Sequence, residues 1–371
     1  MPRHAPAPER GSHEHVVTFP GFPFRMRVAG VGSSELRHAC DGSMLAAGEV
    51  ARAAGTKNYT LRVSRRAPRA THARAGLGSP VTSFVRYRRG SDEDTVSVPG
   101  GRVRIRPGRP DAAASIRPDG DLRAVLEPAV SHALALQGLA VVHAAAFDAA
   151  GFGVLAVGSS FSGKSTFAAA ALVAGARVIS DDSVVVGRGV RGEPTVGALR
   201  RNLHLRDASV DVLPPSLRAR VAPDPGAPGG RWCLPRAAAA ERFVGAAPLR
   251  VIVDLRLDRR RRASFFGRAS QAETLAAIIR STSPLFLSAR YGTERARLLP
   301  VLREAVAAAV CLRACIGRDL LASPAEVIGR LLEAAGLPAD CRRGERSESS
   351  RVELTGDASL GGNRAETGLT L

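Results

Sequence analysis

Short stretches of alternating apolar and polar residues occupy the first third of the chain, which is the pattern of half-buried β-strands. They lie at residues 24–28, 59–63, 83–87 and 103–105. Glycine- and proline-containing segments separate these stretches, as turns between strands do. Residues 1–16 are polar and proline-rich, so we expect them to be disordered, and we predict a β-rich N-terminal domain over residues 17–112.

The pattern changes to a mixture of helices and buried strands after residue 112. Apolar residues recur at helical spacing over residues 122–139, and residues 164–174 predict a second helix that ends at Gly175. Short apolar runs predict buried strands at residues 140–144, 153–157 and 177–179. This alternation of strands and helices is typical of an α/β fold.

The downstream part of the chain continues the α/β pattern. A buried strand is predicted at residues 251–257. Two capping boxes, in which a serine is followed three residues later by a glutamate, predict helix starts at Ser270 and Ser323. We therefore predict an α/β domain over residues 113–338. Residues 339–371 are rich in Arg, Glu, Ser and Gly, which predicts a disordered tail.

A glycine-rich loop of the form G-x-x-x-x-G-K-S joins the strand predicted at 153–157 to the helix that follows it. In such loops successive backbone amides surround phosphate oxygens, and the helix presents its positive end to the same anion. Lys164 is expected to bind the β- and γ-phosphates, and the Ser165 hydroxyl to bind Mg²⁺. We predict that ATP and Mg²⁺ bind at Gly158, Ser159, Ser160, Phe161, Ser162, Gly163, Lys164, Ser165 and Thr166.

Two adjacent carboxylates, Asp181 and Asp182, follow the strand predicted at 177–179. One could hold Mg²⁺, and the other could accept a proton from an incoming hydroxyl. An aspartate pair that caps a turn is the structural alternative. His143 ends an apolar strand, where it is either a core residue or a third member of the site.

Together these elements resemble the catalytic core of HPr kinase/phosphorylase. The resemblance rests on residues 142–146, 153–158, 163–165 and 175–182. It is close over residues 139–187, looser to residue 338, and absent from the N-terminal region. It implies a P-loop kinase core of the HPr kinase / phosphoenolpyruvate carboxykinase type, which transfers the γ-phosphoryl group of ATP to a serine hydroxyl. It also implies assembly into homo-oligomers.

The resemblance also implies roles for individual residues. Asp181 would be the general base, and Asp182 would be the carboxylate linked to Mg²⁺, together with Ser165. His143 and Lys164 would lie beside the transferred phosphoryl group. The sequence does not order the two aspartates, whose roles could be exchanged.

Several positions depart from the family pattern. Thr166 stands where the family carries glutamate, so phosphorylase activity is not expected, and Phe161 stands where glycine is common. The family's downstream signature has no counterpart, so HPr itself is not the expected substrate. The acceptor is predicted to be a hydroxyl of a protein, a peptide or a small molecule. Arg200 or Arg201 could return to the site as an arginine finger.

The net charge of +19 raises a second possibility, a nucleic-acid-binding protein. We do not expect this, because the basic residues are almost all arginines and are spread along the whole chain. No signal peptide and no apolar run of membrane-spanning length occurs, so we expect a cytoplasmic protein without a membrane partner. A sensor that binds nucleotide without transferring phosphate remains the other alternative.

Overall fold

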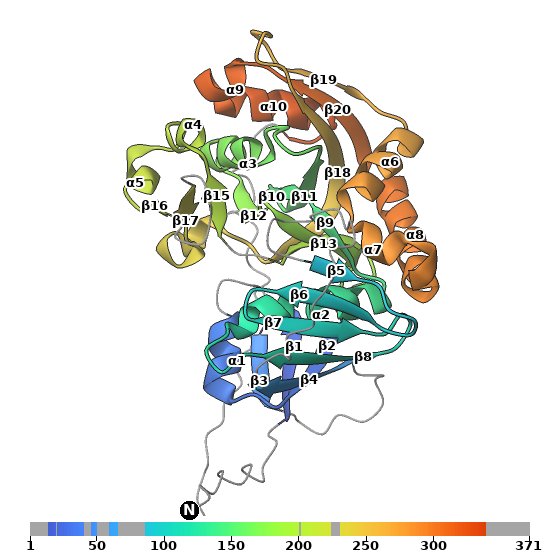
Figure 1. The fold of residues 1–371 in the computed structure, drawn as a ribbon. Coiled ribbons are helices and arrows are strands. Elements are labelled where there is room, and N and C mark those ends of the chain that lie inside the picture. Colours follow the sequence, from blue (N-terminus) through green and yellow to red (C-terminus); the bar gives the residue numbers. More distant parts are fainter. Residues whose placement is uncertain are drawn as a thin grey trace, which may run out of the picture.

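The computed structural model describes the protein at residues 14–19, 21–40, 46–49, 59–65, 86–199, 202–223 and 231–338. Figure 1 shows an N-terminal sheet at the bottom and a larger α/β part above it. The mixed α/β class expected from the sequence is therefore confirmed. The kinase type of the fold stays a prediction, and the predicted tail at 339–371 lies outside the described residues.

The strands of the N-terminal sheet are short and mostly antiparallel. They are β1 (Glu14–Phe19), β2 (Phe24–Ala29), β3 (Ala46–Glu49), β4 (Tyr59–Arg65), β5 (Arg86–Arg88), β6 (Asp94–Val98), β7 (Gly101–Ile105) and β8 (Asp111–Ile116). Their order in the sheet is β3-β1-β2-β4-β8-β7-β6-β5, and β4 runs parallel to both β2 and β8. Buried and more exposed residues alternate along β2, β4 and β8, as half-buried strands do.

Strand β1 begins inside the segment that was expected to be disordered. His15, Val17 and Phe19 are buried, and the His15 imidazole Nε2 lies 3.2 Å from the Val31 carbonyl oxygen. The alternation was not recognised in the sequence because His15 is a polar residue type. In the structure it is buried, with a hydrogen-bond partner. The expectation of disorder is therefore wrong for residues 14–16.

The helices are distributed over both parts of the molecule. The α-helices are α1 (Ser33–Cys40), α2 (Leu122–Leu136), α3 (Lys164–Val173), α4 (Asp207–Val210), α5 (Pro215–Arg218), α6 (Gln271–Ser281), α7 (Pro284–Leu287), α8 (Gly292–Ala308), α9 (Asp319–Ala322) and α10 (Pro324–Ala334). Single 3₁₀ turns are η1 (Arg236–Ala238), η2 (Ala240–Arg242) and η3 (Ala289–Tyr291). None of these described helices combines the length and the hydropathy that crossing a bilayer requires.

Helix α2 joins the two parts of the molecule. Its first turn is capped by the Asp121 carboxylate, which accepts a hydrogen bond from the Arg123 amide at 2.9 Å. It packs against β7 and β8 on one side and against α8 on the other. The predicted boundary at residue 112 falls inside β8, so the core of the N-terminal sheet continues across that boundary and includes α2.

Of the two predicted capping boxes, one forms. At the start of α6 the Glu273 amide donates to the Ser270 hydroxyl, and the Glu273 carboxylate accepts from the Ser270 amide at 2.9 Å. Helix α10 starts at Pro324 as expected, but the Ser323 side chain makes no cap hydrogen bond. The second capping box is therefore wrong, because Ser323 also ends α9 and its backbone dihedral angles, φ −139° and ψ 63°, are set by that tight junction.

The C-terminal sheet carries the glycine-rich loop that the sequence predicts to bind phosphate, called the phosphate loop below. Its strands are β9 (Ala140–His143), β10 (Ala145–Ala149), β11 (Phe152–Val157), β12 (Arg177–Ser180), β13 (Ser183–Arg188), β14 (Pro194–Ala198), β18 (Ala246–Leu257), β19 (Phe265–Arg268) and β20 (Val310–Ile316). The order β12-β10-β11-β18-β14-β13-β9 is extended by β20, which pairs with β18, and by β19. Strands β11, β18 and β20 are parallel neighbours.

Helices cover both faces of this sheet. On β11, Val154 and Ala156 belong to the core that α3 and α10 form on one face. Leu155 and Val157 belong to the core on the other face, where α6 and α8 lie. A small third sheet consists of β15 (Leu203–Leu205), β16 (Ala222–Pro223) and β17 (Trp232–Leu234), and β15 packs against α3.

A buried carboxylate ties the N-terminal sheet to the C-terminal helices. Asp94 of β6 accepts hydrogen bonds from the Tyr87 hydroxyl, from Arg290 Nε at 2.9 Å and from the Tyr291 hydroxyl at 2.8 Å. The Gly90 amide also donates to it, at 3.2 Å. Burial by itself raises the pKa of Asp94, but these donors outweigh it and leave the pKa below its usual value.

This network predicts a pH-dependent contribution to stability. Because the pKa of Asp94 is lower in the folded state, its contribution is fully present above the unfolded pKa of about 3.9. It is lost as the pH falls through the lower, folded pKa. We expect wild type to melt at a higher temperature than Asp94→Asn at pH 7, and the gap to narrow below about pH 4. Thermal melts of both proteins from pH 7 to pH 3 check this, and a constant gap would contradict it.

Candidate active site

The phosphate loop spans Gly158 to Gly163 and connects β11 to α3. Gly158 follows the last residue of the strand, and a Cβ atom there would lie 2.5 Å from the Ser162 hydroxyl and 2.7 Å from the Leu255 carbonyl oxygen. Gly163 precedes the helix at φ +93°, in the left-handed region that glycine adopts without strain. Both glycines of the motif are thus required by the shape of the loop.

The first turn of α3 can accept an anion. Among the described residues, the amides of Lys164, Ser165 and Thr166 have no recorded backbone acceptor, as is usual for a helix start. The Ser162 hydroxyl is buried within the loop and has no hydrogen-bond partner there. Unpaired donors around a helix N-terminus fit the oxygens of a phosphate group. The predicted phosphate-binding residues are therefore brought together in a loop of suitable form.

Lys164 lies in the loop and not in solvent. Its ammonium group is buried and donates to the carbonyl oxygens of Gly158 at 2.9 Å and Ser159 at 3.0 Å. Burial lowers the pKa of Lys164, and the charges of Asp182 and Asp181 oppose this shift. Strand β12, which the two aspartates follow, packs against α3, the helix that begins at Lys164.

Phe161, the bulky residue of the loop, points outward. It has φ +66° and is 77% exposed, so its ring does not fill the space around the helix start. The guanidinium carbon of Arg206 lies 4.8 Å from the centre of the ring, which is a cation–π contact. The exposed ring and Arg206 together form one wall beside the loop.

Asp181 follows β12 and is fully enclosed. One carboxylate oxygen accepts the His204 backbone amide at 3.1 Å, and the other lies 3.4 Å from His204 Nδ1. Burial raises the pKa of Asp181, and the contacts with His204 oppose that shift. The structure thus pairs Asp181 with a histidine that the sequence analysis did not include.

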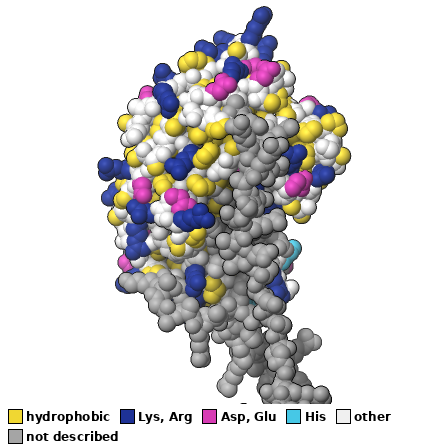
Figure 2. Space-filling view, turned by 180° about the vertical axis from the view of Figure 1, so that it is seen from behind, with side chains coloured by type: hydrophobic (Ala, Val, Ile, Leu, Met, Phe, Trp, Pro, Cys, Tyr) yellow, Lys and Arg dark blue, Asp and Glu magenta, His cyan; other side chains and the backbone are white. Residues whose placement is uncertain are grey.

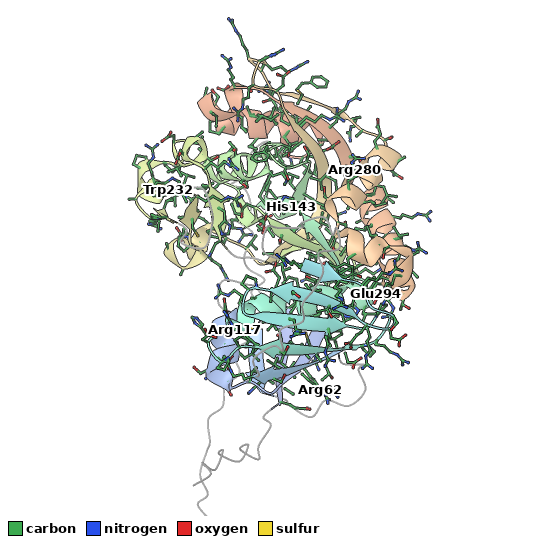
Figure 3. The ribbon with its side chains drawn as sticks, viewed as in Figure 1. Arg62, Arg117, His143, Trp232, Arg280 and Glu294 are labelled. Atoms are coloured by element: carbon green, nitrogen blue, oxygen red, sulfur yellow. The ribbon has the colours of Figure 1, made fainter. Side chains whose placement is uncertain are left out.

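Asp182 and His143 form a second, more exposed pair. Strands β9 and β13 are antiparallel and place His143 opposite Ser183. The His143 Nδ1 atom lies 3.2 Å from Asp182 Oδ1 and 3.0 Å from the Asp182 carbonyl oxygen. The side chains of His143 and Asp182 are 50% and 32% exposed, so His143 is not a core residue. Figure 3 shows His143 near the middle of the C-terminal part.

The remaining predicted positions are placed as follows. Ser165 lies in the first turn of α3 and is half-buried, while Ser159 and Ser160 are exposed on the loop. The Thr166 hydroxyl lies 2.8 Å from the Ser209 hydroxyl, which ties the start of α3 to α4. Arg200 and Arg201, the proposed arginine fingers, lie outside the described residues.

Sequence reasoning missed His204 and Arg206. Both come from the segment around β15, far along the chain from the loop. The alternation of Leu203, His204 and Leu205 was the available signal, because two buried leucines on one face of a strand place the residue between them on the other. Nothing in the sequence indicated that the other face of this strand contacts Asp181.

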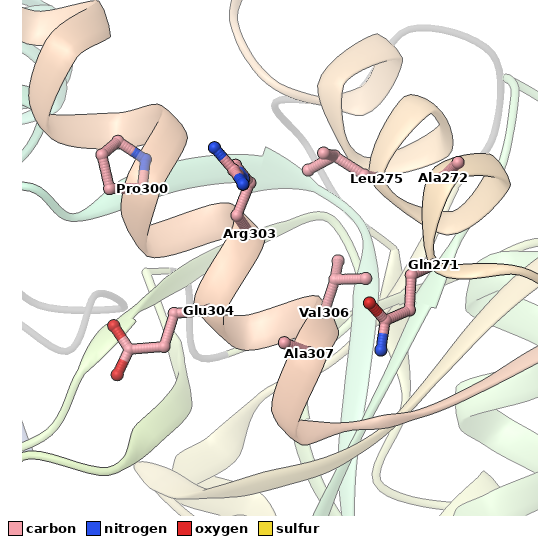
Figure 4. A pocket seen from close by; sticks show the side chains of 8 residues that line it. All are labelled: Gln271, Ala272, Leu275, Pro300, Arg303, Glu304, Val306 and Ala307. Atoms are coloured by element: carbon pink, nitrogen blue, oxygen red, sulfur yellow. The ribbon is translucent and has the colours of Figure 1, made fainter.

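A hollow of the described structure lies apart from this site. It has a volume of about 440 Å³ and lies between α6 and α8, on the sheet face opposite α3 (Figure 4). Its polar lining is limited to Gln271, Arg303 and Glu304, and Glu304 already pairs with Arg188 at 2.8 Å. Size alone therefore does not mark the chemical site of this protein.

Basic side chains do not gather over one element on the face drawn in Figure 2. On the part of that face that the structure describes, they are interspersed with hydrophobic and acidic side chains. A nucleic-acid-binding surface commonly carries a continuous basic stripe. The visible arrangement gives no support to that alternative.

Comparison with known proteins adds little to this picture. No family model matches the chain, and no curated protein matches it. A solved structure, the Hpr(Ser) kinase/phosphatase from Coxiella burnetii, is 14% identical, and the match covers 35% of this chain and 77% of that one. Its TM-score of 0.21 is too low to establish a shared fold. The family resemblance therefore stays a prediction.

Proposed function

We propose that the chain is a kinase that transfers the γ-phosphoryl group of ATP to a hydroxyl group. The observation that carries this proposal is the glycine-shaped loop at the start of α3, together with the Asp181 carboxylate at the end of β12, a strand that packs against α3. A phosphate loop alone explains nucleotide binding, whereas carboxylates beside its lysine provide the groups that a transfer reaction needs. Serine in a protein or peptide is the first acceptor to test, and a small hydroxyl compound is the second.

The donor set beside the loop fits Mg²⁺, which prefers oxygen ligands and keeps several waters. Ser165 offers a hydroxyl from the first turn of α3, and Asp182 offers a partly exposed carboxylate. The difference in exposure supports Asp182 as the metal ligand, because the Asp181 side chain is only 1% exposed and that of Asp182 is 32% exposed. We therefore assign Asp182 to the metal. Bound Mg²⁺ would neutralise charge on the β- and γ-phosphate oxygens.

Other residues of the chain bind the phosphate oxygens, stabilise the developing charge and position the Asp182 carboxylate. The loop amides and the Ser162 hydroxyl bind phosphate oxygens, and Lys164 moves from the loop carbonyls to the γ-phosphate as charge develops there. His143 holds the Asp182 carboxylate through Nδ1. Arg206 and Phe161 lie at the rim, where an acceptor would enter.

The proposal is tested with labelled nucleotide and a serine acceptor. Purified protein, Mg²⁺ and [γ-³²P]ATP are incubated with a library of serine-containing peptides and with matched peptides that carry alanine instead. We expect label in serine peptides only.

A sensor would give a different result. The hydrogen bonds of Lys164 to its own loop are compatible with a protein that only binds nucleotide. Fluorescent ATP that binds with micromolar affinity, without label in any peptide, in a small hydroxyl compound or in cell extract, would replace the kinase proposal with the sensor. Absence of nucleotide binding would refute both.

A further inference from the structure

The carboxylate of Asp181 is closed to solvent, but the imidazole that binds it is partly exposed. The Asp181 side chain is 1% exposed, whereas that of His204 is 21% exposed. A general base must come within hydrogen-bond reach of the proton that it accepts. An enclosed carboxylate is poorly placed for this, whereas the partly exposed ring beside it is accessible to an acceptor.

The position of His204 follows from how β15 packs. Leu203 and Leu205 are buried in the core that contains α3, so the residue between them faces the opposite side. There the His204 amide donates to Asp181 at 3.1 Å, which fixes the backbone, and Nδ1 lies 3.4 Å from the other carboxylate oxygen. Two residues further along, Arg206 contacts the Phe161 ring, so this segment lies beside the loop.

We infer that His204 is the proton acceptor of the transfer reaction and that Asp181 positions it. This inference rests on the proposed kinase function and replaces the sequence-based role of Asp181 as base. With Nδ1 bound to Asp181, Nε2 is the atom that receives the proton from the acceptor hydroxyl. The acceptor oxygen forms a bond to the γ-phosphorus, the bond from that phosphorus to the bridging oxygen breaks, and ADP leaves.

The carboxylate has two effects on the ring in this arrangement. It selects the tautomer that carries hydrogen on Nδ1, and it stabilises the imidazolium ion after proton transfer. It does not take the proton itself. Asp181→Asn therefore removes a positioning residue, while His204→Gln removes the catalytic residue.

The test uses the intrinsic hydrolysis of [γ-³²P]ATP in the presence of Mg²⁺, with water as the acceptor. We expect His204→Gln to lower kcat by about 100-fold or more, the typical contribution of general base catalysis, and to leave KM for ATP within about threefold. His204→Asn serves as a second variant, since both keep the backbone bond to Asp181. His38→Gln, on the exposed face of α1 in the N-terminal part, is the matched control and should keep full activity.

The outcomes separate the two proposals. If wild type turns over no ATP and labels no acceptor, the proposed function fails, whatever the variants do. If wild type is active and folded His204→Gln keeps kcat within threefold while Asp181→Asn is inactive, Asp181 is the base and the inference is overturned. A parallel loss of ATP affinity and kcat in both histidine variants would also overturn it, because that result indicates a structural role.

Discussion

Lys164→Ala is expected to lower ATP turnover by about 100-fold or more, the usual cost of removing a charged group that stabilises the transferring phosphate. The lysine ammonium lies within the loop, bonded to the Gly158 and Ser159 carbonyl oxygens, and both aspartates favour its charged form. Alanine removes this positive charge next to two carboxylates. We therefore expect weaker ATP binding as well as slower chemistry.

Steady-state phosphate release and fluorescent-ATP titration measure the two effects separately. Lys57→Ala is the matched control, because Lys57 is the only other lysine of the chain. Circular dichroism melts show whether the buried site tolerates alanine. Turnover by folded Lys164→Ala within threefold of wild type would rule out the phosphate loop as the reaction site.

His132→Leu is expected to destabilise the protein by about 3 kcal/mol, because it leaves a buried carboxylate with too few donors. His132 of α2 and Glu294 of α8 are both fully buried, with Nε2 and Oε1 2.9 Å apart. The Tyr59 hydroxyl lies 2.8 Å from His132 Nδ1, and the Gly108 amide donates to Glu294 at 2.8 Å. Leucine keeps the volume but removes the His132 donor from this carboxylate oxygen.

The network of Tyr59, His132 and Glu294 also joins distant parts of the chain, since Tyr59 lies in β4 of the N-terminal sheet. Urea unfolding followed by tryptophan fluorescence and by circular dichroism measures the change. Glu304→Gln is the control on the same helix, because Glu304 pairs with Arg188 at the surface, where such pairs contribute at most about 1 kcal/mol. Equal unfolding midpoints for His132→Leu and Glu304→Gln would contradict the role given to the buried network.

The predictions that succeeded describe local features. The capping box of Ser270 and Glu273 depends on residues three apart, and the glycine-rich turn between β11 and α3 depends on eight consecutive residues. Phosphate binding by this turn stays a prediction. Short-range hydrogen bonds and backbone freedom decide such features, so the sequence shows them directly. The failed capping box at Ser323 is the exception, because a second helix end competes for the same residue.

The sequence by itself determined the glycine-rich turn, the strand before it and the helix after it, since glycine and apolar residues occur in an order that favours a strand, a tight turn and a helix. Tertiary structure alone decided that Asp181 is enclosed, that His204 binds it and that His143 holds Asp182. These relations arise from the packing of β15 beside α3 and from the pairing of β9 with β13. Such contacts join residues far apart in the chain, and the residue pattern within either segment does not specify its partner.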